Sequence, residues 1–174
     1  MKIFLIGLPG AGKTTVGKDL ARKLSVPFLD LDAEIETRER RQIQQLFKTQ
    51  GESYFRKIES LVLKEWCCST SDFVMATGGG TPCFFDNMDQ INKAGESFFL
   101  DVPTKEIANR IKKSNLNKRP LFENLHEEEL KDKIEFLRSQ RMGFYQKAHH
   151  RIVSDQVNVN DITSQLNAKK EIQE

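Results

Sequence analysis

Short apolar runs alternate with helical patterns along most of this chain. Apolar runs predict strands at residues 2–6, 27–31, 73–77 and 97–102, with a short fifth strand at 151–153. Apolar residues at helical spacing predict helices over 13–25, from about 53, and along Leu130, Ile134 and Leu137. Thr104 can cap a further helix over 104–113, and the tail from 161 is predicted to be a polar helix. Strands separated by helices predict an α/β fold, a parallel sheet with helices on both faces.

One segment interrupts the alternation. Residues 114–126 read SNLNKRPLFENLH, are mostly polar, and lie between two predicted helices. A connection of that length without secondary structure is uncommon unless it is functional or mobile. We therefore expect a mobile loop here that takes part in function.

Composition narrows the class of protein. The chain has 174 residues and 38% hydrophobic content, enough for a single domain with one core. Charged residues make up 30%, but the net charge is only +2, which argues against nucleic acid or a membrane surface as a partner. No apolar run approaches the thickness of a bilayer. The three cysteines form no C-x-x-C pair, which favours a reducing, cytoplasmic location.

The first strand leads into a phosphate-binding sequence. Residues 7–15 read GLPGAGKTT and match G-x-x-x-x-G-K-[ST], the P-loop, with a predicted strand before it and a predicted helix after it. Its glycines allow backbone N–H groups to surround an anion at a helix N-terminus. Lys13 is expected to reach the β- and γ-phosphates, and the Thr14 hydroxyl to bind Mg²⁺.

The nucleotide is predicted to be ATP. Common GTPases recognise guanine with N-K-x-D, and the two N-K pairs here continue as Ala94-Gly95 and Arg119-Pro120. Neither supplies the aspartate. The P-loop alone does not separate a kinase from an ATP-driven switch.

Two carboxylates follow the second predicted strand. Alternation along a strand would place Asp30 and Asp32 on one side, at the carboxyl end where parallel sheets bind ligands. Such a pair suits metal and hydroxyl binding. The same residues can instead be helix-start caps, because Ala-Glu-Ile-Glu follows.

Two arginines occupy unusual positions. Arg56 lies four residues after Glu52 and three before Glu59, so both carboxylates can brace it on a helix. From spacing alone, an ordinary exposed ion-pair ladder is the simpler interpretation. Arg141 continues the apolar stripe of its predicted helix, where a guanidinium either extends to solvent or meets an anion.

Three consecutive glycines follow the third predicted strand. Gly78, Gly79 and Gly80 leave the backbone bare just past that strand. Their position predicts a close approach by a ligand, and the alternative is a flexible turn.

Taken together, these segments resemble one family, shikimate kinase. The resemblance runs from residue 2 to about 153. It rests on GLPGAGKTT, D-x-D at 30–32, F-R-K-I-E at 55–59, G-G-G at 78–80, K-R-P-L at 118–121 and R-x-x-x-Y at 141–145. It implies a P-loop three-layer sandwich with about five parallel strands in the order 2-3-1-4-5 and a lid at about 114–126. The whole of residues 1–174 would form one kinase domain, with the shikimate-binding region at about 32–62.

On the acceptor side, the resemblance implies a complete shikimate site. Asp32 would hold the accepting hydroxyl, and Arg56 and Arg141 would clamp the carboxylate. The bare backbone of Gly78, Gly79 and Gly80 would leave space for shikimate and offer it N–H groups. Phe47 and Phe55 would line the pocket.

On the nucleotide side, the resemblance implies MgATP. The P-loop residues that bind it would be Gly10, Ala11, Gly12, Lys13, Thr14 and Thr15. Arg110 would pack on adenine, Arg119 would reach the transferred phosphate, and Asp30 would act on Mg²⁺ through water. Lys13, Asp32 and Arg119 would be catalytic.

The chain departs from the family pattern at two places. Arg40-Arg41 stands where the family often has Gly-Arg, which can reshape that turn. Thr81-Pro82-Cys83-Phe84 replaces the commoner small residues after the glycines.

The expected activity is phosphorylation of shikimate by ATP, in a monomer. Two alternatives are a P-loop kinase for another hydroxylated acid, such as gluconate, and a regulatory ATP-binding protein without catalysis. A regulatory protein that only binds ATP would not require Asp32 or the arginines Arg56 and Arg141 on the acceptor side.

Overall fold

A computed structural model describes residues 1–113 and 126–173. Their strands form a five-stranded parallel sheet in the order β2-β3-β1-β4-β5. The strands are β1 (Lys2–Ile6), β2 (Phe28–Asp30), β3 (Phe73–Ala76), β4 (Glu96–Asp101) and β5 (His150–Val153). The predicted α/β class and strand order are confirmed.

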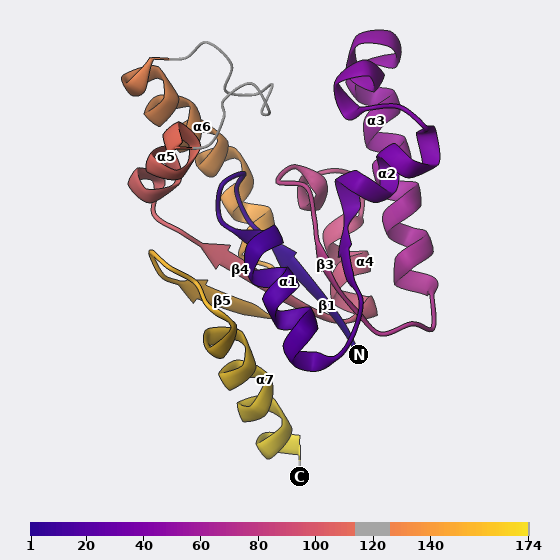
Figure 1. Ribbon diagram of the computed structural model, residues 1–174, viewed down its shortest axis with the longest axis vertical. Coiled ribbons are helices and arrows are strands. Elements are labelled where there is room, and N and C mark those ends of the chain that lie inside the picture. The colour runs from indigo at the N-terminus through magenta and orange to yellow at the C-terminus, as the bar shows by residue number, and fades with distance from the viewer. Residues whose placement is uncertain (114–125, 174) are drawn as a thin grey trace.

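Helices cover both faces of this sheet (Figure 1). They are α1 (Lys13–Leu24), α2 (Leu31–Glu39), α3 (Ile43–Cys68), α4 (Asn87–Ala94), α5 (Thr104–Lys113), α6 (Glu127–Tyr145) and α7 (Val159–Gln173), with a 3₁₀ turn η1 (Thr81–Cys83). Helix α1 packs on β1 and β3 and contacts α7, while α3 contacts α4 and η1. None of the helices among the described residues combines the length and the apolar character needed to cross a membrane.

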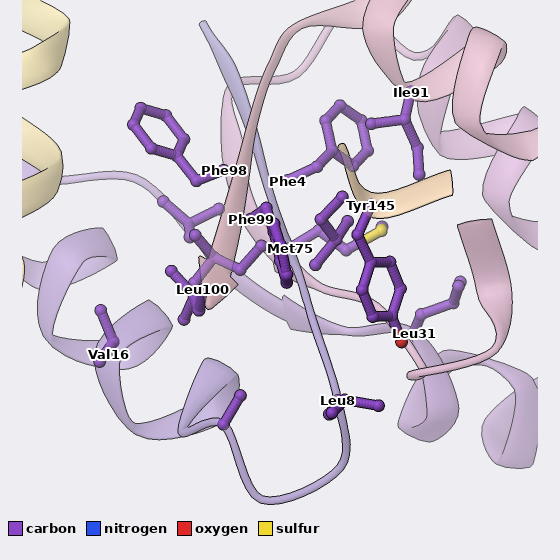
Figure 2. Packing of buried hydrophobic residues seen from close by; sticks show 14 of the residues in the cluster. Phe4, Leu8, Val16, Leu31, Met75, Ile91, Phe98, Phe99, Leu100 and Tyr145 are labelled. Atoms are coloured by element: carbon purple, nitrogen blue, oxygen red, sulfur yellow. The ribbon is translucent and has the colours of Figure 1, made fainter. Parts of the chain in front are cut away.

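The central strands are apolar because both of their faces are covered. β1 and β3 are almost entirely buried, as expected for inner strands of a parallel sheet. Side chains from the strands, α1 and α6 meet in one core, and Figure 2 shows the Tyr145 ring of α6 inside it. That ring lies 5.0 Å from the ring of Phe99 on β4. Helix α6 is therefore anchored directly to the sheet.

Several predicted elements change near the site. The predicted strand 27–31 shortens, because Asp30 accepts a hydrogen bond from the Asp32 backbone N–H at 3.2 Å and caps α2. The predicted helix from about 53 is the second part of α3, which begins at Ile43 and is broken at Gly51 (φ 80°, ψ 171°). Helix α2 was anticipated only by the helix-cap alternative for Asp30 and Asp32, and α4 was not predicted.

The turn after α2 bears on one departure from the family pattern. Arg40 has φ 51° and ψ 34°, the left-handed conformation that glycine adopts most easily. The turn thus takes a glycine-like conformation with an arginine.

Candidate active site

The P-loop connects β1 to α1, and the side chain of Lys13 is hydrogen-bonded to the backbone of this loop. Gly7 has φ 145°, and a Cβ there would lie 2.8 Å from the Leu100 carbonyl oxygen, so only glycine fits. Lys13 is 8% exposed, and its Nζ donates to the carbonyl oxygens of Gly7 at 2.8 Å and Leu8 at 3.0 Å. The loop and the N-terminus of α1 thus have the arrangement that the P-loop sequence predicts, a glycine-rich turn that leads into a helix N-terminus.

Thr14 and Asp30 lie together at the edge of the P-loop. The Thr14 hydroxyl donates to Oδ2 of Asp30 at 3.1 Å. Asp30 also caps α2 through its other carboxylate oxygen, so the helix-cap interpretation of this residue is correct. The cap holds the carboxylate beside the P-loop and does not remove it from the site. A hydroxyl and a carboxylate are oxygen ligands of the type that Mg²⁺ prefers.

Asp32 has a different position from the predicted one. It lies in the first turn of α2 instead of on β2, because α2 begins at Leu31. Its pKa is raised from 3.8 to about 6, chiefly by burial and then by the negative charges of Asp30 and Glu59. Lys13 and Arg56 act in the opposite direction. Asp32 is therefore electrostatically coupled to the P-loop lysine and to the acceptor-side arginine together.

Arg56 is held by both predicted carboxylates. Nε and Nη2 donate to Oε1 of Glu52 at 3.2 Å each, and Nη1 donates to Oε2 of Glu59 at 2.9 Å. The Arg56 side chain is 13% exposed and that of Glu59 is fully buried. The exposed-ladder interpretation holds only for Glu52, whose side chain is 58% exposed, because α3 packs Arg56 and Glu59 against the segment after β3.

The three glycines lie where these side chains converge. A Cβ on Gly78 would lie 3.2 Å from Oδ1 of Asp32, and one on Gly80 would lie 2.8 Å from Nη2 of Arg56. A Cβ on Gly79 would lie 2.8 Å from Cδ of Pro9 in the P-loop and 3.0 Å from Nη1 of Arg141. The bare backbone of these glycines is thus closely surrounded by the candidate site side chains, and a Cβ would not fit without a shift of those neighbours.

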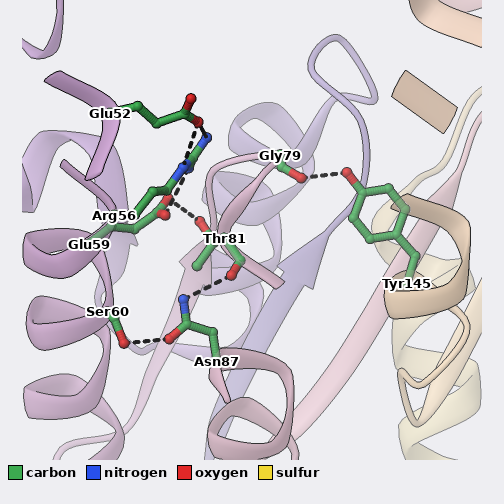
Figure 3. Close-up of polar contacts among 8 residues, drawn as sticks. All are labelled: Glu52, Arg56, Glu59, Ser60, Gly79, Thr81, Asn87 and Tyr145. Atoms are coloured by element: carbon green, nitrogen blue, oxygen red, sulfur yellow. Dashed lines mark hydrogen bonds and ion pairs between the residues drawn. The ribbon is translucent and has the colours of Figure 1, made fainter. Parts of the chain in front are cut away.

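Arg141 extends toward these glycines from α6. Its Nη1 is buried and has no hydrogen-bond partner among the described residues. One turn later, the buried Tyr145 donates its hydroxyl to the Gly79 carbonyl at 2.5 Å (Figure 3). A buried guanidinium nitrogen without a partner favours an anion partner over extension to solvent.

Arg110 lies over the opposite end of the P-loop. Its Nη1 donates to the Ala11 carbonyl at 3.3 Å, and its Nε to Glu106 at 2.8 Å. The Asp155 carbonyl accepts a further hydrogen bond from Nη2. The predicted nucleotide-side arginine is therefore fixed beside Gly12, where a Cβ would lie 3.3 Å from Nη1.

The remaining predicted residues have mixed outcomes. Arg119 and residues 114–125 of the predicted lid lie outside the described residues. The ring centroids of Phe47 and Phe55 lie 4.7 Å apart with the ring planes tilted by 37°, and Phe47 is 38% exposed.

Sequence reasoning missed a buried polar network behind Arg56 (Figure 3). Thr81 donates to Oε1 of Glu59 at 2.6 Å, Asn87 donates to the Thr81 carbonyl at 2.9 Å, and Ser60 donates to Asn87 at 2.7 Å. Glu59 was found through its spacing from Arg56. Thr81 and Asn87 gave no local signal, because their partners lie far away in sequence.

Comparisons with known proteins agree with this geometry. A family model described as shikimate kinase matches residues 9–170. The curated shikimate kinase of Phocaeicola vulgatus is 46% identical over 156 residues, which span 90% of this chain and 88% of that protein. The crystal structure of shikimate kinase from Bacteroides thetaiotaomicron has a TM-score of 0.89 and 36% identity, covering 98% of each chain.

A second solved structure is described with a ligand. Shikimate kinase from Acinetobacter baumannii, in complex with shikimate, has a TM-score of 0.85 and 32% identity, covering 99% of this chain and 94% of that one. The family model and these relatives each match most of the chain. This chain therefore belongs to the shikimate kinase family.

Proposed function

We propose that this protein transfers the γ-phosphoryl group of ATP to a hydroxyl of shikimate, forming shikimate 3-phosphate. The observation that carries the proposal is the convergence of Asp32, Arg56 and Arg141 on the glycines at 78–80, directly beside the P-loop. A relative of known structure holds shikimate. A hydroxyl acceptor needs a carboxylate next to the transferred phosphate, and an acidic acceptor needs cations on its far side.

Asp32 orients the attacking hydroxyl and takes its proton. With a pKa of about 6 it is mostly ionised near neutral pH, yet basic enough to accept a proton as the new O–P bond forms. The bond between the γ-phosphorus and the bridging oxygen breaks, and ADP leaves with the electron pair. Catalysis of this kind depends on positioning and charge neutralisation more than on covalent chemistry.

Arg56 and Arg141 bind the shikimate carboxylate. They come from α3 and α6, and both reach the same glycine segment. Two guanidinium groups favour a carboxylate, and a planar fork can hold both of its oxygens. Phe47 and Phe55 form an apolar side of the shikimate region at about 32–62.

The nucleotide side uses the P-loop and Arg110. Gly10, Ala11, Gly12, Thr14 and Thr15 surround the phosphates, Lys13 neutralises the β- and γ-phosphates, and Arg110 packs on the base. Arg119 keeps the role that the sequence predicts for it, next to the transferred phosphate.

Magnesium fits the pair formed by Thr14 and Asp30. Both supply oxygen donors within 3.1 Å of each other at the edge of the phosphate cradle. Thr14 would bind the ion directly and Asp30 through water. The ion would neutralise the negative charge that develops on the phosphate oxygens during transfer.

All the candidate site residues that the structure describes come from one chain, which supports our proposal of a monomeric enzyme. All three cysteines are free, which suits a reducing compartment, and we propose the cytoplasm.

The test is ATP consumption with shikimate, with gluconate and with no acceptor. We expect turnover with shikimate only. Equal consumption with gluconate would favour the broader kinase, and ATP binding without consumption in all three reactions would favour a regulatory protein.

A further inference from the structure

The segment after the three glycines differs from the family pattern, and it lies against the carboxylate-binding arginine. Phe84, at the end of η1, places its ring centroid 4.2 Å from Cζ of Arg56. The ring of Phe55 lies at 5.0 Å from the same atom. A guanidinium at these distances from an aromatic ring is attracted by the ring's negative face.

The edges of the Arg56 guanidinium are largely occupied already. Three of its five N–H groups donate to Glu52 and Glu59. The two that remain, one on Nη1 and one on Nη2, donate to no other described residue. Both nitrogens lie beside Gly80, where a Cβ would come within 2.9 Å of each. The two nitrogens with a remaining N–H group therefore lie at the bare backbone, where the acceptor carboxylate is proposed to bind.

The carboxylates of Glu52 and Glu59 fix the position of the Arg56 guanidinium within its own plane. These hydrogen bonds restrain a tilt of that plane less strongly. An aromatic ring adds the missing constraint, because contact at 4.2 Å favours one orientation of the flat group over it. The Phe84 ring itself is only half-buried, so its value for the core is limited.

The backbone that carries Phe84 is firmly held. The Cys83 N–H donates to the Gly80 carbonyl at 2.9 Å, and the Asn87 N–H donates to the Phe84 carbonyl at 3.2 Å. Asn87 and Thr81, on either side of Phe84, are both buried and tied to α3 through Ser60 and Glu59. The ring and the arginine are thus fixed relative to the same helix.

We infer that Phe84 is a positioning residue for substrate recognition: it orients Arg56 so that the free end of its guanidinium meets the carboxylate of the acceptor. This inference rests on the proposed function. Phe84 acts through Arg56, and it takes part in neither phosphoryl transfer nor nucleotide binding.

The test is Phe84→Leu, with Phe84→Tyr and Phe85→Leu alongside. Leucine keeps an apolar side chain but removes the ring, and tyrosine keeps the ring. Phe85→Leu makes the same chemical change at the neighbouring position, where the side chain is 63% exposed and has no cation–π contact with Arg56. Calorimetric titration gives the dissociation constant for shikimate, and steady-state kinetics gives KM and kcat for shikimate and ATP.

Phe84→Leu should weaken shikimate binding about 3- to 30-fold, corresponding to about 0.7 to 2 kcal/mol at 1.4 kcal/mol per tenfold. The loss should appear in KM for shikimate, with kcat and KM for ATP within about twofold, since the ring serves only the carboxylate end of the site. Phe84→Tyr and Phe85→Leu should bind shikimate like the parent.

Three results would overturn the inference. One is that Phe84→Leu binds shikimate as tightly as the parent. Another is that Phe85→Leu loses as much shikimate affinity as Phe84→Leu. The third is that Phe84→Tyr loses as much shikimate affinity as Phe84→Leu although it unfolds at the same temperature as the parent. A failure of the proposed function is distinct, because the parent protein itself would then not bind shikimate.

Discussion

Replacing Asp32 with asparagine should stabilise the fold while it removes activity. Asp32 is a carboxylate held among Asp30 and Glu59 in a partly buried site, so its charge is unfavourable for folding. Asparagine is nearly isosteric and neutral. The substitution therefore separates what the fold prefers at this position from what the proposed chemistry requires.

The magnitude follows from the pKa. A rise from 3.8 to about 6 is a difference of roughly two pH units, and at 1.36 kcal/mol per unit the ionised form costs about 3 kcal/mol at neutral pH. Part of this is lost because the amide must be desolvated and loses the attraction to Lys13. We expect a net gain of about 1–2 kcal/mol, which raises Tm by about 2–8 °C for a domain of this size.

The gain should depend on pH with a defined sign. The folded pKa lies above the unfolded one, so the folded parent binds the proton more tightly between about pH 4 and pH 6. Lowering the pH through this window removes the penalty in the parent and leaves asparagine unaffected. The stability difference between Asp32→Asn and the parent should therefore shrink from pH 7 toward pH 4.

Thermal unfolding from pH 4 to 7, paired with turnover at pH 7, tests this reasoning. Turnover should fall by about 10²- to 10⁴-fold, the usual contribution of a positioned base. In the parent, kcat/KM should decrease below pH 6 as Asp32 becomes protonated. Glu34→Gln, on the same helix, is the control and should change stability by less than about 0.5 kcal/mol. A lower Tm for Asp32→Asn at pH 7, or parent-like turnover, would refute the assignment.

Three further substitutions test other parts of the site and one turn. Arg141→Ala should weaken shikimate binding about 10- to 100-fold in calorimetry, since a charge-assisted contact contributes about 1.5–3 kcal/mol, with ATP binding unchanged and Arg141→Lys recovering only part of the loss; parent-like shikimate affinity would contradict the clamp. Lys13→Ala should lower turnover at least about 100-fold in a protein that still unfolds cooperatively, and near-normal turnover would exclude its role. Arg40→Gly should stabilise the protein by about 0.5–1 kcal/mol in thermal unfolding, because φ 51° is unfavourable for a side chain, whereas Arg41→Gly should not; no gain would mean that the arginine side chain compensates for its backbone.

The sequence by itself determined the parts of this protein that depend on local pattern. The P-loop is visible because a phosphate cradle needs glycines, Lys13 and Thr14 at fixed spacing between a strand and a helix. The inner strands β1 and β3 are visible because burial on both faces demands continuous apolar runs. The strand order was implied by the family resemblance and not by periodicity.

The ends of the strands and helices near the site could be located only from the backbone hydrogen bonds of the structure. Asp30 and Asp32 look like alternating strand residues, but the Asp30 carboxylate accepts a capping hydrogen bond from the Asp32 N–H, and α2 begins at the residue after Asp30. A carboxylate near a turn caps a helix only if a neighbouring backbone N–H lacks another partner. The amino-acid sequence alone does not show which N–H groups lack one.

Only the tertiary structure decided which charged side chains are buried and which groups they contact. The spacing of Glu52, Arg56 and Glu59 is compatible with an exposed ladder. Arg56 and Glu59 are largely buried because α3 meets Thr81 and the glycines after β3, while Glu52 stays exposed. From the sequence, Arg141 can extend to solvent or meet an anion. The structure favours the anion, because α6 brings Arg141 to Gly79 and its buried Nη1 has no hydrogen-bond partner among the described residues. Burial and charge coupling depend on distances in space between segments that are far apart in sequence, which local periodicity does not encode.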